Sequence, residues 1–226
     1  MEFTYYGHSC FAVVVEGKTI LFEPNIKPNK LAKDIDIKAI KADYILISHG
    51  HFDHITDAVQ LAQLTGAKVV TNVEIAAWLK KQGLTNLHAM NVGGHFIFEF
   101  GKVKCVAAVH SSCMPDGTYG GSAMGFLVES EAGNIYYSGD TALTYDMKLI
   151  GDYKRIDICM LPIGNNFTMG IDNAIIAAEF VRCDKVIGLH FDTFDIIKIN
   201  HEEATDKFSN AGKELLLPVI GKTIEI

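Results

Sequence analysis

Short apolar runs broken by glycine, proline and asparagine dominate the hydropathy pattern of this chain. Most of these runs are rich in β-branched or aromatic side chains, which is typical of strands. Some runs are separated only by a tight turn such as Glu16-Gly17, so hairpins are expected between them. The pattern predicts strands at 2–6, 10–15, 18–22, 44–48, 68–71, 95–100, 102–109, 123–130, 134–138, 157–161, 185–189, 215–219 and 222–226.

Fewer segments carry apolar residues at helical spacing. Ile55, Ala58, Val59 and Ala62 recur at i, i+3, i+4 and i+7, so a helix is predicted over 55–65. Other segments begin with a residue that can cap a helix, or show one face of small apolar residues. These segments predict helices from Asn72 to Gly83, at about 173–182, and from Asn200 onward, with a lysine-rich surface connection over 26–42.

The order of these elements is similar in the two halves of the chain. Each half contains hairpins and then strand–loop–helix units, and two such halves suit two sheets packed face to face with helices outside. The length of 226 residues suits one large domain, or two halves that share a core. We therefore expect an α/β (α+β) fold, a four-layer αββα sandwich, as one domain over residues 1–226.

Composition narrows the class of protein. Hydrophobic residues make up 49% and charged residues 21%, which is ordinary for a soluble enzyme. No apolar run reaches the roughly 18 residues that a membrane span needs, and no secretory leader is recognisable. The net charge of −7 disfavours a nucleic-acid surface. The five scattered cysteines are typical of reduced thiols, so a cytoplasmic location is expected, with a homo-oligomer left open.

One stretch of six residues, His49-Gly50-His51-Phe52-Asp53-His54, concentrates three imidazoles and one carboxylate. It lies between the strand at 44–48 and the helix at 55–65, where rigid elements on both sides position functional groups. Neutral imidazole and carboxylate are ligands that suit Zn²⁺ and its first-row neighbours. The alternative is a polar loop that happens to hold three of the nine histidines of the chain.

Several predicted strands end in a residue that can bind a metal ion: His49, His110, Asp140 and His190. Ligand sites in layered α/β folds gather at the carboxyl ends of strands. One edge of the protein would then collect five histidines and two aspartates, enough for two metal ions with open positions for water and substrate.

The six-residue cluster, followed by a lone histidine, an aspartate and a final histidine, resembles the metallo-β-lactamase superfamily. Motifs along the rest of the chain are similar to those of a widespread group of metal-dependent hydrolases related to the ascorbate-6-phosphate lactonases. These motifs are Gly7-His8-Ser9-Cys10, Ser138-Gly139-Asp140-Thr141, Leu161-Pro162-Ile163-Gly164, Phe167-Thr168-Met169-Gly170 and His190-Phe191-Asp192-Thr193-Phe194.

The resemblance implies a set of metal ligands. It implies that His49, His51 and His110 hold one metal ion, that Asp53, His54 and His190 hold a second, and that Asp140 bridges the two. A metal-bound hydroxide is then the implied nucleophile, and Asp53 is placed to orient the water and take its proton. No thiolate is among these ligands, so Zn²⁺ is expected first, with Mn²⁺, Ni²⁺ or Fe²⁺ as alternatives.

Residues outside the implied set of metal ligands also have expected roles. His8 acts on the substrate or in proton transfer, or it is a solvated loop residue. Thr141 is expected to hold Asp140 by a hydrogen bond, and Asp192 and Thr193 are expected to support the ligands in the same way. Glu23-Pro24 stands where relatives commonly have Asp-Pro, which concerns loop detail rather than a predicted ligand. The remaining histidines, His88, His95 and His201, are expected to be structural.

These observations predict a metal-dependent hydrolase that cleaves a small ester, such as a lactone or a phosphodiester. One alternative is an iron-dependent dioxygenase, because some members of the superfamily use the same cluster with one iron. Another is a non-catalytic protein that binds nucleic acid or a metabolite and keeps the metals for structure. Metal content and stoichiometry separate these hypotheses.

Overall fold

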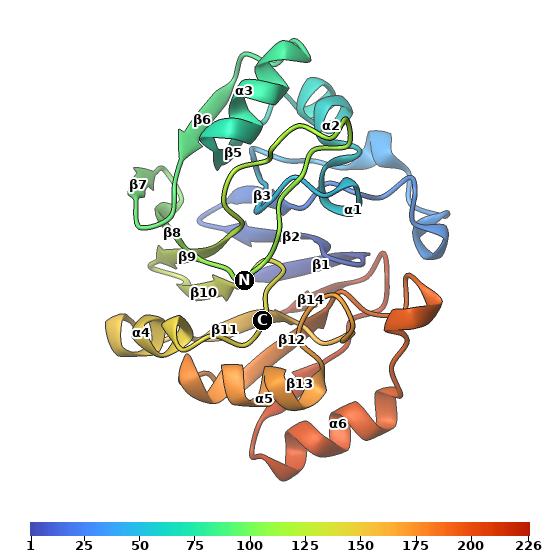
Figure 1. The fold of residues 1–226 in the computed structure, drawn as a ribbon, viewed down its shortest axis with the longest axis vertical. Coiled ribbons are helices and arrows are strands. Elements are labelled where there is room, and N and C mark those ends of the chain that lie inside the picture. The colour runs from blue at the N-terminus through green and yellow to red at the C-terminus, as the bar shows by residue number, and fades with distance from the viewer.

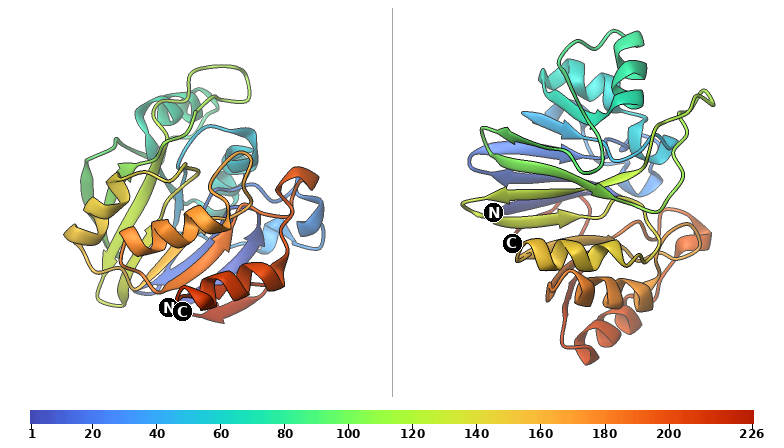
Figure 2. Two further views of the ribbon diagram at one scale, coloured as in Figure 1. Left: turned by 60° about the horizontal axis from the view of Figure 1, so that its bottom comes forward. Right: turned by 60° about the vertical axis from the view of Figure 1, so that its left-hand side comes forward.

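Two seven-stranded sheets pack face to face in the computed structural model, which describes residues 1–226. Figure 1 shows helices α2 (Ala58–Thr65) and α3 (Val73–Lys81) outside one sheet, and α4 (Asp146–Tyr153), α5 (Ile171–Phe180) and α6 (His201–Asn210) outside the other. The right-hand view of Figure 2 shows the resulting layers of helix, sheet, sheet and helix. The predicted αββα sandwich is confirmed.

The two sheets share one arrangement of strand directions. The first sheet has the order β14-β1-β2-β3-β4-β5-β6, antiparallel from β14 to β3 and parallel from β3 to β6. Its strands are β1 Glu2–Gly7, β2 Cys10–Val15, β3 Lys18–Phe22, β4 Tyr44–Leu46, β5 Lys68–Asn72, β6 Leu87–Met90 and β14 Thr223–Glu225. The second has the order β13-β12-β11-β10-β9-β8-β7, parallel from β13 to β10 and antiparallel from β10 to β7. Its strands are β7 His95–Phe98, β8 Gly101–Ala107, β9 Met124–Ser130, β10 Gly133–Tyr137, β11 Ile158–Pro162, β12 Lys185–Leu189 and β13 Glu214–Leu216.

Three buried apolar clusters lie between these layers. One lies between the two sheets, and the other two lie between each sheet and the helices that cover it. The central cluster contains stacked aromatic rings from both sheets. Phe11 and Phe22 stack with their centroids 4.5 Å apart, and Tyr137 of the facing sheet meets Phe22 edge to face at 5.5 Å. Such aromatic pairs contribute packing beyond the area that they bury. They fix the two sheets against each other and so hold the strand ends of both sheets in register.

The structure differs from the sequence pattern at three places. The helix predicted over 55–65 is divided into α1 (Phe52–Ile55) and α2, because the Asp57 carboxylate between them accepts the backbone N–H groups of Ile26 and Lys27 at 2.7 and 2.8 Å. Helix α4 and strand β6 were not predicted. The predicted strands at 215–219 and 222–226 correspond to β13, which pairs with β12, and β14, which pairs with β1.

The two ends of the chain meet at one sheet edge. The Met1 amino group donates to the carbonyl of Ile226 at 3.1 Å, and the Ile226 N–H donates to the carbonyl of Met1 at 2.8 Å. Figure 2 shows the two termini side by side. No helix of the structure has the length and apolar character that crossing a membrane requires, and all five cysteines are free thiols.

Candidate metal centre

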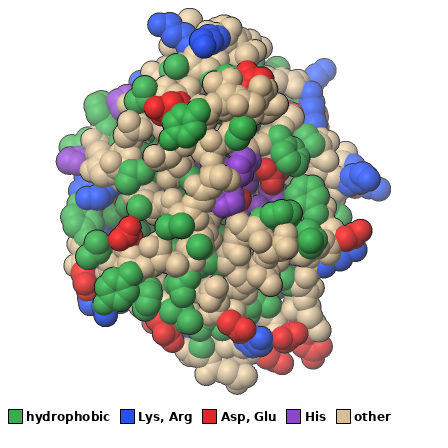
Figure 3. Space-filling model, in the orientation of Figure 1, with side chains coloured by type: hydrophobic (Ala, Val, Ile, Leu, Met, Phe, Trp, Pro, Cys, Tyr) green, Lys and Arg blue, Asp and Glu red, His purple; other side chains and the backbone are tan.

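The side chains singled out from the sequence come together where the strands of both sheets end. The cluster His49–His54 follows β4 and runs into α1, Asp140 follows β10, and His190 follows β12. His8 follows β1, and His110 lies in the loop after β8. Figure 3 shows histidine side chains in a hollow on this face, with hydrophobic side chains on its rim. The structure therefore brings all eight residues into one site; their roles stay predictions.

One part of the site consists of imidazoles, His49, His51 and His110, which we call the histidine trio. Nε2 of His49 lies 3.0 Å from Nδ1 of His51, and Nε2 of His110 lies 3.3 Å from the same atom. His49 is fully buried, whereas His51 and His110 are half-buried and face the cavity. Three ring nitrogens thus converge at the wall of a solvent-accessible hollow.

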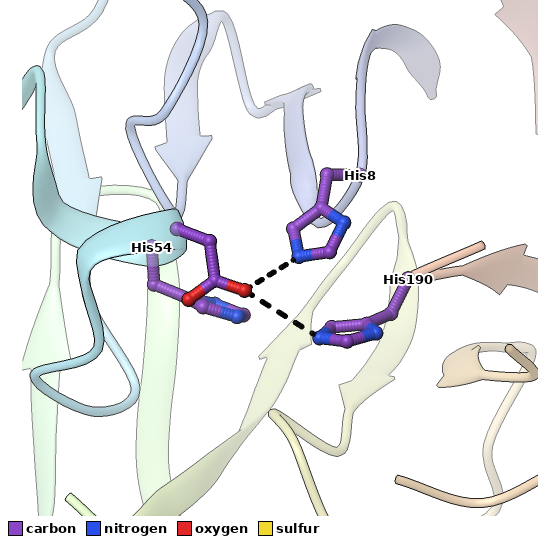
Figure 4. A group of neighbouring side chains, drawn as sticks. His8, His54 and His190 are labelled. Carbon is purple, nitrogen blue, oxygen red and sulfur yellow. Dashed lines mark hydrogen bonds and ion pairs between the residues drawn. The ribbon is translucent and has the colours of Figure 1, made fainter. Parts of the chain in front are cut away.

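The other part, which we call the carboxylate-backed group, comprises Asp53, His54 and His190. Figure 4 shows His54 and His190 beside His8. Oδ2 of Asp53 lies 3.0 Å from Nε2 of His8 and 3.9 Å from Nε2 of His190. Behind this group lies Glu23, fully buried, whose Oε2 accepts the Nδ1–H of His54 at 2.7 Å. The backbone N–H of Ser48 donates to the other Glu23 oxygen at 2.7 Å. A carboxylate that accepts from one ring nitrogen turns the second nitrogen of that histidine toward a metal ion.

Asp140 lies between the two parts of the site. Its Oδ2 atom is 2.9 Å from Nε2 of His190 and 3.2 Å from Nε2 of His54. The same oxygen is 3.7 Å from Nε2 of His110 and 3.9 Å from Nε2 of His49. One oxygen therefore faces ring nitrogens of both the histidine trio and the carboxylate-backed group, as a bridging ligand requires.

The charges of the two parts differ. Burial lowers the pKa values of His49, His51 and His110 below the ordinary range of histidine, so the trio is neutral at pH 7. Burial also opposes the charge of His54, but the carboxylates of Asp140 and Glu23 raise the pKa of this imidazole well above its usual value. The ring of His54 therefore carries a proton beside the ionised Asp140 when no metal is bound, while burial raises the pKa of Glu23 behind it.

The two aspartates of the site remain ionised. Burial works against the charge of Asp53, but the hydrogen bond from His8 and the charge of His54 hold the pKa of this carboxyl below its usual range. Burial likewise opposes the charge of Asp140, and the nearby His190 and His54 hold its pKa well below the ordinary value. Both carboxylates are thus available as acceptors and ligands at neutral pH.

His8 holds Asp53 in place and is itself held by Thr193. Its Nε2 atom lies 3.0 Å from Oδ2 of Asp53, and its Nδ1 atom lies 3.0 Å from Oγ1 of Thr193. Burial, with the nearby His190, lowers the pKa of His8 to about 4, so this ring is neutral. A neutral ring that donates from Nε2 to a carboxylate must accept at Nδ1, so the Thr193 hydroxyl donates to it.

The donor set fits divalent metal ions. The Ser48 hydroxyl donates to Glu23 at 3.1 Å, so it accepts the Nδ1–H of His49 at 2.9 Å and leaves a lone pair on Nε2. Nε2 of His54 and Oδ1 of Asp140 are buried without a hydrogen-bond partner. Buried polar atoms without partners are rare in folded proteins, and an ion at this position accounts for them. The nitrogen and oxygen donors suit Zn²⁺ and other first-row ions.

The backbone around the site adopts an uncommon conformation. His8, Glu23 and His190 have φ angles of 57°, 48° and 55°, in the left-handed region that side chains with a Cβ rarely adopt. Such strain concentrates at functional sites, where the surrounding structure maintains it. Next to His190, a Cβ on Gly164 would lie 2.1 Å from the His190 carbonyl oxygen. Only glycine at this position allows the loop after β11 to pass so close to His190.

Some expectations about supporting residues were right and others wrong. Thr193 does support the site, through His8. Thr141 does not hold Asp140: its hydroxyl accepts the N–H of Val109 at 3.0 Å and donates to the carbonyl of Ala142. It thereby joins the loop that carries His110 to the loop that carries Asp140. Glu23 was noticed in the sequence only as a departure at a loop, and its role behind His54 was missed.

Comparisons with known proteins identify relatives that are named metal-dependent hydrolases. Residues 2–190 match the family model described as the β-lactamase superfamily domain. The chain is 53% identical to a UPF0173 metal-dependent hydrolase of Flavobacterium johnsoniae over the whole of both chains. It is 41% identical to the UPF0173 metal-dependent hydrolase YtkL of Bacillus subtilis, again over the whole of both chains.

Solved structures show the same relationship. Igni18, a metallo hydrolase of the archaeon Ignicoccus hospitalis, superposes with a TM-score of 0.89 at 32% identity, over 99% of this chain and 97% of its own. An isothiocyanate hydrolase from Delia radicum gut bacteria superposes with a TM-score of 0.79 at 18% identity, which shows a shared fold. The fold and the histidine–aspartate cluster define a metallo-β-lactamase-type metalloprotein. Within that superfamily, this chain belongs to the UPF0173 metal-dependent hydrolases.

Proposed function

We propose that this protein hydrolyses a small ester, such as a lactone, a phosphodiester or a related compound, with two divalent metal ions. The observation that carries the proposal is the position of Asp140, one oxygen of which faces nitrogens of both the histidine trio and the carboxylate-backed group. In this proposal the trio holds one ion, the carboxylate-backed group holds the other, and Asp140 joins them.

The metal ions would supply two things when bound: polarisation of the scissile carbonyl or phosphoryl oxygen, and a water whose pKa is lowered toward neutrality. Zn²⁺ is the ion that we expect, and Mn²⁺, Ni²⁺ and Fe²⁺ suit the same nitrogen and oxygen donors. To become a ligand, His54 must release the proton on its Nε2 atom. The hydrogen bond from its Nδ1–H to Glu23 keeps the ring oriented with Nε2 toward the site.

The residues of the chain perform the proton transfer. Asp53 is an ionised carboxylate on the floor of the cavity, so it can orient a water molecule and accept its proton. His8 is a neutral ring that donates to one oxygen of Asp53, which restricts the rotation of this carboxylate. We therefore assign Asp53 as the general base and His8 as the residue that positions it.

Two further observations concern the location of the protein and the size of its substrate. The five free thiols fit a reducing compartment, which supports a cytoplasmic location. The cavity over the site has a volume of about 470 Å³, a size that suits a small molecule.

The test has two stages, metal analysis and then activity. Purified protein should contain two equivalents of metal, and metal-restored protein should hydrolyse members of a panel of lactones, phosphodiesters and thioesters. Asp53→Asn should lower the turnover of any accepted substrate strongly, whereas His95→Ala, an exposed strand residue on β7, should leave it unchanged. One iron per chain, together with no hydrolysis by any metal form, would favour the dioxygenase alternative and contradict the proposal.

A further inference from the structure

Hydrophobic side chains form much of the wall of the cavity above the metal centre. Phe52, Phe167 and Ile196 are exposed to 54%, 54% and 62%, although large apolar side chains are usually buried. Phe194 joins them, and its ring centroid lies 6.4 Å from that of Phe52. The cavity is lined by His51, Phe52, Asp53, His110, Ser111, Asp140, Phe167, His190, Phe194 and Ile196.

The ring of Phe167 is held over the site by an ordered turn. Gly164 and Gly170 form an isolated antiparallel bridge at the base of this turn. The N–H of Asn165 donates to the carbonyl of Met169 at 3.0 Å, and the N–H of Met169 donates to the carbonyl of Thr141 at 3.1 Å. The turn is thus anchored to the loop that carries Asp140. Together with Phe52, Phe194 and Ile196, the ring of Phe167 forms one continuous apolar part of the cavity wall.

No lysine or arginine lines the cavity. On the segment that carries Ile196, Lys198 forms an ion pair with Asp195 at 2.6 Å. A phosphate or carboxylate on the part of the substrate away from its reacting bond would therefore lie against phenyl and alkyl groups, with no lysine or arginine of the cavity wall to pair with it. Removing such a charge from water without a partner is strongly unfavourable.

We propose that the site selects substrates in which the acyl or alkyl group attached to the reacting bond is apolar, and discriminates against substrates in which that attached group carries a phosphate or carboxylate. The nature of that bond rests on the proposed function, whereas the choice of the attached group rests on the cavity wall alone. Phe52, Phe167, Phe194 and Ile196 are then the residues that determine specificity.

The first experiment measures binding and needs no turnover. Straight-chain alkyl hydroxamates, whose head groups bind metal ions, are titrated into zinc-loaded protein by calorimetry. Affinity should rise about two- to fourfold for each added methylene, the gain that burial of one CH₂ group gives. A hydroxamate of equal length that ends in a carboxylate should bind at least about tenfold more weakly, because its charge finds no partner.

Variants locate the effect on the cavity wall. Phe167→Ala and Ile196→Ala should reduce the gain per methylene, and Ile196→Lys should restore binding of the hydroxamate that ends in a carboxylate. Leu149→Ala is the matched control, since Leu149 on α4 is exposed to 63% and lies outside this cavity. It should bind the whole series as the unmodified protein does.

The outcomes separate this inference from the proposed function. An affinity that does not change with chain length, or tighter binding of the hydroxamate with a terminal carboxylate, would overturn the inference whichever bond the enzyme cleaves. A graded preference for apolar chains, combined with no hydrolysis of any lactone or ester, would support the inference and refute the proposed hydrolysis.

Discussion

The histidine trio and the carboxylate-backed group are built from similar residues, but they are stabilised differently. His54 lies between Glu23 and Asp140, so the carboxylate-backed group has opposite charges in contact before any metal binds. The trio has no carboxylate in direct contact, and its ring nitrogens face one another at 3.0–3.3 Å. The first arrangement holds its own counter-charges within the fold, whereas the second consists of neutral imidazoles, two of which line a solvent-accessible cavity.

This difference shows that metal binding and folding stability need not depend on the same ligands. Removing a member of a buried charge pair leaves its partner without compensation, and this is strongly destabilising. Removing a half-buried neutral imidazole leaves a small space open to water. Substitutions in the two parts should therefore affect stability unequally and metal content similarly.

The largest effect is expected from His54→Ala. This change leaves Glu23 and Asp140 buried without their counter-charge, so unfolding free energy should fall by about 3–5 kcal/mol, and activity should be lost. Urea unfolding of the metal-free protein measures the first effect, and His95→Ala is the control because its side chain lies on an exposed strand. A metal-free His54→Ala protein as stable as the unmodified one would remove the proposed distinction between the two parts.

His110→Ala should separate metal content from stability. The trio loses one ligand, so we expect about one equivalent of metal per chain and a decrease in activity of several orders of magnitude. Unfolding free energy of the metal-free protein should change by less than about 1 kcal/mol, since His110 is half-buried and its nearest carboxylate oxygen is 3.7 Å away. Elemental analysis beside urea unfolding makes the comparison, and a destabilisation equal to that of His54→Ala would contradict it.

His8→Ala tests a residue that touches a ligand without being assigned as one. Metal content should stay at the value of the unmodified protein while kcat falls about 10²-fold, because Asp53 loses the bond that orients it. His8→Gln, whose amide N–H lies near the position of Nε2 and can still donate to Asp53, should recover part of the activity. Loss of metal from His8→Ala would mean that His8 belongs to the ligand set.

Thr193→Val is expected to have the smallest effect. The variant removes the hydroxyl that donates to Nδ1 of His8 and keeps the shape of the side chain. Turnover should fall about two- to tenfold, which corresponds to the net contribution of one hydrogen bond, and metal content should not change. Combining Thr193→Val with His8→Ala should add nothing further to the effect of His8→Ala, since both act through the same bond.

The convergence of the candidate ligands could largely be predicted, because several of them follow an apolar run. His49, Asp140 and His190 come shortly after strands whose pattern is plain in the sequence, and strand ends meet at one edge of a layered fold. His201 shows the limit of such reasoning. It begins α6, as expected of a structural residue, yet its Nε2 lies 2.6 Å from Asp192, next to Thr193. His201 therefore touches the segment that supports His8, although the sequence gives no sign of this contact.

The supporting residues could not be predicted, because their partners lie far away in the sequence. Glu23 and His54 are 31 positions apart, and His8 and Thr193 are 185 positions apart. Both contacts also depend on left-handed backbone at His8 and Glu23, which hydropathy does not encode. Helix α4 was missed for another reason: Leu149 and Tyr153 are exposed to 63% and 50%, so its apolar residues do not mark one buried face.

The meeting of the two termini allows the order of the chain to be changed without changing the fold. Met1 and Ile226 are already joined by two backbone hydrogen bonds, so a short flexible linker could connect them. New ends could then be opened at Gly83, between α3 and β6, where no neighbouring atom lies within 4 Å of an added Cβ. Such a circular permutant would begin within the first sheet and still place His8 and His190 side by side. The metal centre would then depend on the arrangement of strands in space rather than on the order in which they are synthesised.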